Sequence, residues 1–368
     1  MNIIEVRSQK ELREFLDFPQ TLYFDILDDE NFVMPIRMIS KIQIGSLKSK
    51  NKLLLLAKED GQVLARLGLY KHQHAGKAKL HFGFFECLPG RKDAAEALFA
   101  HGRKAFPDLE VIGPFCFRME DPYMGTLIEG FENEPYFMMP YNPNYYDEYL
   151  KACGLNGIMD VVAWDIKRTQ PHEELFSRAE QCKKEGYTVR WMTKRSMKKD
   201  VEIIARIFND ALSENWGFEE LIAQQVKEMY MMFRIFVDPD LVCFAQKDGK
   251  DVGCGIAIPN FNPAIKSGKG ALSPRILWNV LTGKKKMESV RGYALGAVRA
   301  HQNKGIGSLL LLNAWTRAQN DIQYQRAQLS WILSGNDSMN SLANRLNGEG
   351  KCKYRIYSSD ENAVLGNA

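Results

Sequence analysis

At 368 residues, the chain is longer than one hydrophobic core usually accommodates, so we expect two domains. Apolar residues make up 45% of the sequence and charged residues 26%, as in ordinary globular proteins. The 49 basic residues barely exceed the 45 acidic residues, which argues against a nucleic-acid-binding protein. The basic clusters Lys198-Lys199 and Lys284-Lys285-Lys286 are local, and we interpret them as solvated surface, with a phosphate-bearing ligand as the alternative.

No apolar run approaches the roughly 18 residues that a membrane-spanning helix needs. The charged N-terminus also lacks the apolar core of a signal peptide. The seven cysteines form no CxxC pair, and their odd number argues for reduced thiols and against a zinc site. We therefore predict a cytoplasmic protein that has no membrane partner and holds no metal ion.

In chain order, the first half opens with the pattern of a β-hairpin. Two apolar runs, at 53–58 and 62–69, flank Asp60-Gly61, where glycine accepts the positive φ of a tight turn. The pattern then predicts a strand at 80–87, a helix at 91–106, a strand at 110–115, a helix opened by Asn144 and closed by Leu155-Asn156-Gly157, and a strand at 159–166.

The second half repeats this order after a charged amphipathic helix within 167–186. Its elements are a hairpin at Asp248-Gly249, a strand at 293–298, a helix at 305–321, a strand at 327–333, a helix opened by Asn336 and closed by Leu346-Asn347-Gly348, and a strand at 353–357. Two helices, at 201–214 and 219–233, precede the hairpin, and an insertion at 261–291 follows it.

The shared order indicates an internal duplication of an α/β unit. A strand, a crossover helix and a second strand form a βαβ unit, so part of each mixed sheet should be parallel. We predict a first domain at 1–168, a linker helix at 169–186 and a second domain at 187–368.

The most informative segment is the turn at 302–307, where an apolar strand leads through two glycines directly into a helix. Such a turn exposes backbone N–H groups that have no partner in the helix, and the helix dipole adds positive potential. Glycine also lets a phosphate approach the backbone closely. The turn is therefore typical of an anion site, although glycines that serve turn geometry alone are the alternative.

Gln302-Asn303-Lys304-Gly305-Ile306-Gly307 resembles the Gln/Arg-x-x-Gly-x-Gly/Ala pattern of the GNAT superfamily of N-acetyltransferases, and it matches neither a Walker loop nor a Rossmann fingerprint. The order of elements from about 187 to 358 resembles the whole GNAT fold, and residues 1–168 resemble a diverged copy. The segments Met138-Met139-Pro140-Tyr141-Asn142-Pro143 and Ser330-Trp331-Ile332-Leu333 resemble bacterial tandem-GNAT proteins of unassigned substrate. The resemblance implies two tandem GNAT-like domains, of which the N-terminal copy is degenerate.

The resemblance further implies acetyl-CoA or another acyl-CoA as co-substrate in the second domain. Asn336 would bind the coenzyme near its reactive end, with a plain helix cap as an equal alternative. Arg299 and His301 would add charge near the phosphates or simply lie exposed. The implied coenzyme contacts are the pyrophosphate-binding residues Gln302, Asn303, Lys304, Gly305, Ile306 and Gly307 and the pantetheine-pairing strand residues Leu295, Ala297 and Val298.

The first half departs from the family pattern at the corresponding turn. Its helix follows Leu88-Pro89-Gly90-Arg91, which contains a single glycine, and Pro89 removes an N–H group where donors are needed. We expect this copy to serve a structural role, or to shape the acceptor site, without binding a coenzyme.

Catalytic groups are harder to assign. Ala343 stands where many GNAT enzymes carry a tyrosine general acid, and backbone N–H groups near Val298 would stabilise an oxyanion. Glu214 is our candidate general base, with a surface carboxylate as the alternative. Trp216 and Phe218 would either line the acceptor pocket or pack locally over the turn between the two helices.

The resemblance implies an acyl-CoA-dependent N-acyltransferase that transfers an acetyl group to a small amine or amino-acid-like acceptor. Two alternatives stay open: a non-catalytic acyl-CoA-binding or regulatory protein, and an aminoacyl-tRNA-dependent transferase. The insertion at 261–291 would either enclose the acceptor or dock the two halves together.

Overall fold

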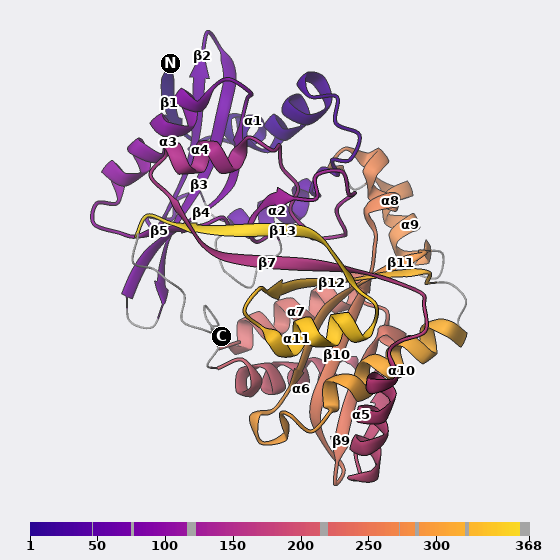
Figure 1. Cartoon of the computed structure of the whole chain (residues 1–368). Coiled ribbons are helices and arrows are strands. Elements are labelled where there is room, and N and C mark those ends of the chain that lie inside the picture. The colour runs from indigo at the N-terminus through magenta and orange to yellow at the C-terminus, as the bar shows by residue number, and fades with distance from the viewer. Residues whose placement is uncertain are drawn as a thin grey trace. The chain divides into compact units, whose positions relative to one another are not determined.

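The computed structural model describes residues 1–45, 47–74, 77–115, 123–213, 220–271, 273–283, 287–320 and 324–360. The chain forms two compact units (Figure 1). Unit 1 contains Met1–Val161, Ile265–Ile276 and the C-terminal segment from Cys352, and unit 2 contains Val162–Ala264 and Leu277–Lys351. The chain therefore returns to unit 1 twice. The domain limits at residues 168 and 186 stay a prediction, because compact units need not be continuous in sequence.

Unit 1 combines a mixed sheet with helices. Its helices are α1 (Gln9–Gln20), the π-helix η1 (Thr21–Ile26), α2 (Arg37–Ile44), α3 (Lys92–Ala105), α4 (Tyr146–Ala152) and the short η3 (Lys266–Gly268). Its strands are β1 (Asn2–Glu5), β2 (Lys52–Glu59), β3 (Gln62–His74), β4 (Lys77–Cys87), β5 (Val111–Gly113) and β6 (Thr126–Glu129), with parts of β7 (Asn156–Lys167) and β13 (Glu349–Ser358).

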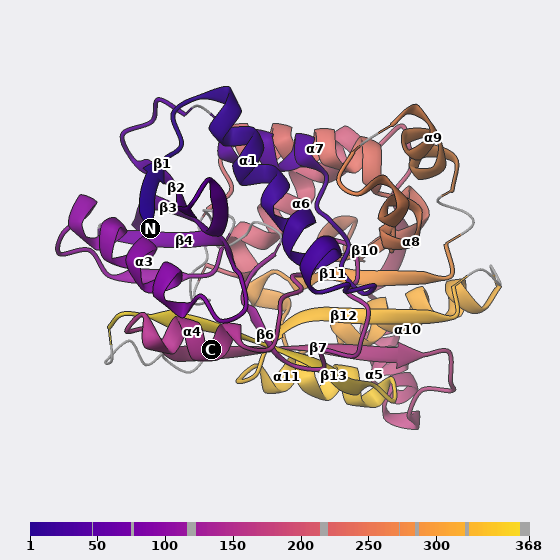
Figure 2. The same cartoon turned by 90° about the horizontal axis from the view of Figure 1, so that it is seen from above.

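The strands of unit 1 pair in the order β1-β2-β3-β4-β5, and the C-terminal end of β13 continues the sheet next to β5. β4 and β5 run parallel, with Leu80 opposite Val111, as the strand–helix–strand pattern predicted. The connecting helix α3 buries its small and apolar face, and α3 and α4 pack side by side (Figure 2).

Unit 2 has the same arrangement with additional helices. Its helices are α5 (Glu173–Lys184), α6 (Met197–Ala211), α7 (Ala223–Phe236), η2 (Pro239–Leu241), η5 (Arg299–His301), α10 (Ile306–Asn320) and α11 (Asp337–Arg345), and α8 (Asn262–Ile265) and α9 (Pro274–Gly283) have residues in both units. Its strands are β8 (Thr188–Trp191), β9 (Val242–Lys247), β10 (Lys250–Pro259), β11 (Ser289–Ala297) and β12 (Arg326–Leu333), with the remainder of β7 and β13.

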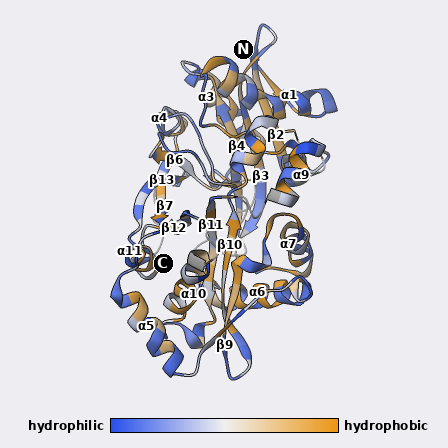
Figure 3. Cartoon of the chain, turned by 90° about the vertical axis from the view of Figure 1, so that its right-hand side faces the viewer, coloured by the Kyte–Doolittle hydropathy of each residue, from blue (hydrophilic) through white to orange (hydrophobic). Residues whose placement is uncertain are grey.

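The strands of unit 2 pair in the order β7-β12-β11-β10-β9-β8, and the central strand β10 is largely hydrophobic (Figure 3). β11 and β12 run parallel, from Ser289 opposite Arg326 to Gly292 opposite Leu329. The predicted crossover helix is α10, which buries Ile306, Leu309 and Leu310 in the core of this unit. The mixed α/β fold with a partly parallel sheet in each unit is confirmed.

Both predicted Asp-Gly turns are confirmed. Asp60 and Gly61 have φ values of 49° and 83°, and Asp248 and Gly249 have 50° and 73°. Positive φ at both central residues lets the turn match the twist of the flanking strands. The linker helix predicted within 167–186 is α5.

The predicted helix ends are right in the second half and wrong in the first. Asn336 caps α11 by accepting the N–H of Met339 at 3.0 Å, and Asn347 adopts a φ of 55° after the helix. In the first half, Gly154 takes the left-handed position with a φ of 73°, and Asn156 already belongs to β7. Asn144 does not cap α4, whose N-cap residue is Tyr145. The Asn156-Gly157 pair could either end the helix or begin the next strand, and in the structure it belongs to β7.

The described cysteines, Cys87, Cys153, Cys182, Cys243, Cys254 and Cys352, are all free and buried. Burial raises the pKa of the Cys87, Cys153 and Cys243 thiols to about 12 and that of Cys182 to about 11, so these thiols stay protonated at neutral pH. Among the described helices, none has the length and apolar character needed to cross a membrane.

A buried polar cluster lies at the centre of unit 1. The Glu86 carboxylate accepts hydrogen bonds from the hydroxyl groups of Tyr146 at 2.7 Å and Tyr23 at 2.9 Å, and Arg66 lies at 3.3 Å. Burial raises the pKa of Glu86. Burial, together with the neighbouring Glu86 carboxylate, also raises the pKa values of Tyr23 and Tyr146. Buried polar groups are tolerated only when their hydrogen bonds are satisfied, so each member of the cluster holds the others in place.

Tyr146→Phe should destabilise the protein by about 1–3 kcal/mol, because it removes a hydrogen bond to a buried carboxylate and leaves a buried N–H group unpaired. Urea unfolding followed by circular dichroism measures the change. Tyr230→Phe on α7 is the matched control, because the Tyr230 hydroxyl makes no hydrogen bond within the described part of the chain. Equal stability of the two variants would contradict this role of the cluster.

Candidate functional site

The turn between β11 and α10 is the candidate site in unit 2. The strand ends at Ala297, the single turn η5 follows, and α10 begins at Ile306. Gln302, Asn303 and Lys304 are exposed, whereas Gly305 and Gly307 are half-buried. The structure thus places the six residues of the predicted motif at the open N-terminal end of a helix.

The corresponding turn in unit 1 can be identified from a shared hydrogen bond. Leu64 and Val252 each lie three residues beyond the glycine of an Asp-Gly turn. The carbonyl of Leu64 accepts the N–H of Leu88 at 2.8 Å, and the carbonyl of Val252 accepts the N–H of Val298 at 2.9 Å. Leu88 and Val298 are therefore equivalent positions at the end of β4 and of β11.

In unit 2 the turn that follows Val298 contains a run of backbone N–H groups without a partner in the described chain. The N–H groups of His301 and Gln302 bond to the carbonyls of Val298 and Arg299, and the first N–H used inside α10 is that of Leu309. Between them, none of the backbone N–H groups of residues 303–308 donates a hydrogen bond within the described part of the chain. A run of unpaired N–H groups at the positive end of a helix is an anion-binding arrangement.

In unit 1 tyrosine hydroxyls bond to backbone groups at the end of β4 and in the turn that follows it. Tyr146 accepts the N–H of Cys87 at 2.8 Å, and Tyr149 accepts the N–H of Gly90 at 2.8 Å. Tyr145 donates to the carbonyl of Cys87 at 2.8 Å. Tyr146 and Tyr149 belong to α4, and Tyr145 is its N-cap residue. Side chains of unit 1 therefore occupy backbone groups of Cys87 and Gly90 next to the turn, and the expectation that this copy holds no coenzyme stays a prediction.

In the alignment predicted from the sequence, α11 carries serines where α4 carries tyrosines. Aligning Asn144 with Asn336 sets Tyr146 against Ser338 and Tyr149 against Ser341. Ser338 is exposed and Ser341 half-buried, whereas both tyrosines are buried. Matching the left-handed residues Gly154 and Asn347 instead sets Tyr149 against Leu342, which lies beside Gly307, so a side chain of α11 also reaches the turn in unit 2.

The end of β11 also has an open edge. Its parallel pairing with β12 stops at Gly292, while its antiparallel pairing with β10 continues to Ala297. Leu295 and Ala297 therefore keep a strand partner on one side only in the paired segments of the described chain. An extended amide-bearing ligand could add to this free edge by backbone hydrogen bonds.

Both glycines of the turn are required by protein contacts as well as by any ligand. Gly305 has a φ of 80°, and a Cβ atom there would lie 3.0 Å from the carbonyl oxygen of Arg178 on α5. A Cβ atom at Gly307 would lie 2.8 Å from a methyl carbon of Leu342 on α11. The two glycines therefore allow α5, α10 and α11 to pack closely, in addition to the access for a phosphate that the sequence predicts.

The remaining motif side chains differ in their surroundings. Gln302 donates through its Nε2 to the carbonyls of Ala297 at 3.3 Å and Ala211 at 3.4 Å, which ties the turn to the end of α6. Ile306 is buried in the core, so only its backbone can serve a ligand. Asn303 has a φ of 60° and Lys304 is exposed.

Two contacts hold the turn from outside the motif, and the sequence did not indicate them. The Asp210 carboxylate accepts the N–H of Arg299 at 2.6 Å, and the Tyr187 hydroxyl lies 2.8 Å from Nδ1 of His301. Asp210 lies in the last turn of α6 and Tyr187 precedes β8, and both are distant from the turn in sequence. Only proximity in the folded chain relates these residues to the turn.

The structure limits the predicted chemistry. Glu214, Trp216 and Phe218 lie outside the described residues, so the candidate base and aromatic wall stay predictions. The N–H of Val298 itself bonds to the carbonyl of Val252, and an oxyanion site formed by N–H groups near Val298 stays a prediction. Ala343 is fully buried against the helix core and offers no acid. The described residues also contain no group of three or more side chains that could hold a metal ion.

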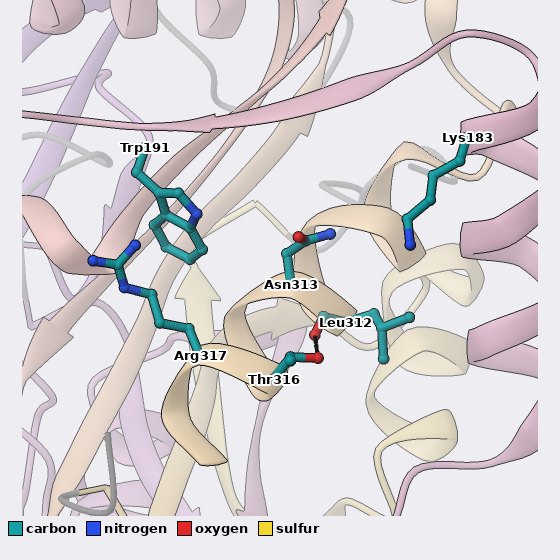
Figure 4. A pocket seen from close by; sticks show the side chains of 6 residues that line it. All are labelled: Lys183, Trp191, Leu312, Asn313, Thr316 and Arg317. Carbon is teal, nitrogen blue, oxygen red and sulfur yellow. Dashed lines mark hydrogen bonds between the residues drawn. The ribbon is translucent and has the colours of Figure 1, made fainter. Parts of the chain in front are cut away.

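A separate groove of about 300 Å³ lies along the outer side of α10. Arg317 stacks on Trp191 with its guanidinium carbon 4.2 Å from the ring centroid (Figure 4). Arg317 also pairs with Asp240 at 2.5 Å. The groove is lined by Lys183, Trp191, Leu312, Asn313, Thr316 and Arg317. It contains none of the predicted site residues.

Gly305→Ala should lower the free energy of unfolding by about 1–3 kcal/mol, because alanine is strained at positive φ and its Cβ presses on the Arg178 carbonyl. Gly335→Ala is the matched control in the same unit, since no atom lies within 4 Å of its Cβ position. That control should change stability by less than about 1 kcal/mol in urea unfolding. Two equally stable variants would show that the turn is not held as described.

Two curated relatives match nearly the whole sequence. The chain is 26% identical to Protein YghO of Escherichia coli (strain K12), covering 95% of this chain and 93% of that protein. It is 25% identical to the bacterial ceramide synthase of Caulobacter vibrioides, covering 97% of each chain. No family model matches the sequence.

Solved structures show the fold. A tandem GNAT protein from the clavulanic acid biosynthesis pathway matches with a TM-score of 0.52 and 12% identity over 97% of each chain. A GCN5-related N-acetyltransferase from Sphaerobacter thermophilus matches with a TM-score of 0.53 and 13% identity, covering 97% of this chain and 95% of that one. A glucosamine N-acetyltransferase region in a fungal multi-domain β-N-acetylglucosaminidase gives a TM-score of 0.58 and 11% identity, with 97% of this chain covering only 38% of that protein. The resemblance predicted from the turn at 302–307 is confirmed at the level of the fold: this protein has the GNAT acyltransferase fold, in the tandem form.

Proposed function

We propose that this protein is an N-acyltransferase that binds an acyl-CoA in unit 2, with the pyrophosphate at the N-terminal end of α10. The observation that carries the proposal is the contrast between the two equivalent turns. In unit 1 tyrosine hydroxyls bond to backbone groups of Cys87 and Gly90, whereas the N–H groups of residues 303–308 in unit 2 have no acceptor within the described chain. A diphosphate supplies the missing acceptors and gains from the helix dipole.

The rest of the coenzyme would follow the free edge of β11. Amide groups of a pantetheine arm would pair beside Leu295 and Ala297, where β12 no longer pairs with the strand. This path brings the thioester toward the junction of β11 with the end of α6, where Gly296 faces Phe208 and Ala211. Gly296 lets the end of α6 pack closely against the strand, whereas unit 1 carries Glu86 at the equivalent position.

The chemical step joins the acyl carbon to an amine. The amine nitrogen attacks the thioester carbonyl, the carbon–sulfur bond breaks, and the proton lost by nitrogen goes to the departing thiolate or to solvent. Alignment of the two reactants supplies roughly 7 kcal/mol or more of the rate enhancement in well-positioned systems. Glu214 stays our candidate general base, which would take the proton from the amine and pass it on. Asn336 serves mainly as the cap of α11.

Lys304→Glu should weaken binding of acetyl-CoA or a longer acyl-CoA by roughly tenfold, because a reversed charge beside a diphosphate costs on the order of 1 kcal/mol or more near a protein surface. Calorimetric titration measures the affinity. Lys250→Glu makes the same charge change at the exposed start of β10 in unit 2 and should leave the affinity unchanged.

The same titration gives the stoichiometry, which should be one coenzyme per chain because tyrosines fill the site of unit 1. Saturating ligand at about 100 times its dissociation constant should add about 2.7 kcal/mol to stability. Two sites per chain, or equal effects of the two lysine variants, would contradict the proposed position of the coenzyme.

The relative from Caulobacter vibrioides favours one class of acceptor. A ceramide is an amide of a long-chain amino alcohol, so a ceramide synthase makes the type of bond that an N-acyltransferase forms. This relative covers 97% of both chains. We therefore include long-chain amino alcohols among the candidate acceptors, together with the small amines and amino-acid-like molecules implied by the GNAT resemblance.

Incubation with a panel of acyl-CoA donors and amine acceptors, followed by mass spectrometry, should yield an amide and free CoA in equal amounts. The panel contains small amines, amino acids and long-chain amino alcohols, each with acetyl- and palmitoyl-CoA. A product with a long-chain amino alcohol alone would select that acceptor class. Coenzyme binding without any amide product would replace the proposal with a non-catalytic binding protein.

A further inference from the structure

Helix α9 exposes large apolar side chains although its other face is well packed. Ser273 opens the helix by accepting the N–H of Ile276 at 3.3 Å, and Pro274 occupies the first turn. Ile276 and Val280, one turn apart, are buried. Leu277 and Trp278 point the other way and are 38% and 67% exposed.

This exposure is notable because Trp278 is the most exposed of the large apolar side chains described in the chain. Single exposed apolar residues are common, but an adjacent leucine and tryptophan on a surface helix form a small apolar patch. Arg275 and Asn279 are exposed beside them and give the patch a polar border.

The segment around α9 also differs in charge from the rest of the chain. Residues 261–287 contain no aspartate or glutamate. Removing this segment leaves 43 basic against 45 acidic residues, so the net positive charge of the protein resides here. Its basic residues are Lys266, Lys269, Arg275, Lys284, Lys285 and Lys286. The last three follow α9 directly in sequence and lie outside the described residues.

We propose that α9 binds the surface of an anionic lipid bilayer, with Trp278 and Leu277 inserted at the headgroup level. Tryptophan prefers this boundary because its ring has an apolar body and a polar N–H. Basic residues flanking a surface helix add attraction to anionic lipids. Apolar insertion together with positive charge fits a bilayer better than a nucleic acid, which would use the charge but leave Leu277 exposed.

A surface helix of this kind needs no membrane-spanning segment. The sequence-based expectation of no membrane partner relies on the lack of a long apolar run, which concerns spanning helices alone. The proposal goes beyond the acyltransferase function and does not depend on it, since none of the α9 residues belongs to the coenzyme site. It would nevertheless bring an acyltransferase to long-chain substrates.

Co-sedimentation of the full chain with vesicles tests the proposal. Binding to phosphatidylcholine vesicles that contain about 30% phosphatidylglycerol should be clear at low salt, fall as salt is raised, and be weak with phosphatidylcholine alone. Trp278→Ala and Leu277→Ala should each reduce binding severalfold. Replacing Lys284, Lys285 and Lys286 with glutamine should reduce it by about fivefold per lysine.

Matched controls separate α9 from the rest of the surface. Met231→Ala removes a side chain on α7 that is 53% exposed, and replacing the exposed Lys194, Lys198 and Lys199 with glutamine removes the same charge elsewhere in unit 2. Both should bind vesicles like the unchanged protein, and all variants should keep its thermal unfolding profile, since the replaced side chains of α9 are exposed.

Three outcomes would overturn the proposal. The first is no binding to either kind of vesicle, and the second is equal loss of binding in the controls and in the α9 variants. The third is binding of transfer RNA that competes with the vesicles and is abolished by the lysine replacements but not by Trp278→Ala. That result would assign the charge of this segment to a nucleic acid.

Discussion

Backbone N–H groups at the turn from a strand into a helix need acceptors, and this need shapes both halves of the protein. The first turns of a helix cannot satisfy their own donors. In unit 1, Tyr146 and Tyr149 of α4 accept the N–H groups of Cys87 and Gly90 just before α3. In unit 2, the N–H groups beside Gly305 have no acceptor within the described chain, and such a row of donors suits an anion.

The two solutions have consequences for the surrounding core. In unit 1, the tyrosine that takes the N–H of Cys87 also donates to Glu86, so the filled site and the buried polar cluster are one hydrogen-bonded system. In unit 2, the equivalent strand carries Gly296, and the end of α6 packs against it. The two copies of the fold therefore differ. Unit 1 is stabilised here by internal hydrogen bonds, whereas unit 2 has an open turn and a free strand edge at the end of β11.

The insertion contributes a property that neither turn provides. Its buried residues Ile276 and Val280 anchor α9, while Trp278 stays exposed beside a segment that holds the net positive charge of the chain. Apolar side chains are left exposed at a cost in hydration free energy, which a lipid surface removes. An acyltransferase fold and a lipid-binding helix together are consistent with long-chain substrates.

The sequence alone determined the local elements and the family fold. Hydrophobic periodicity and the Asp60-Gly61 and Asp248-Gly249 turns predict hairpins and βαβ units because the preferences involved act over a few residues. The Gly305 turn was recognisable for the same reason, since its donors and glycines are adjacent in sequence.

Tertiary structure alone decided which groups meet. The contacts of Tyr149 with Gly90 and of Asp210 with Arg299 join residues far apart in the chain, as does the return of the last strand to the sheet of unit 1. The end of α4 was mispredicted because Asn156 was drawn into β7 by pairing that no local pattern encodes. Local preferences determine a turn or a helix end only where long-range hydrogen bonding and packing do not compete for the same backbone groups.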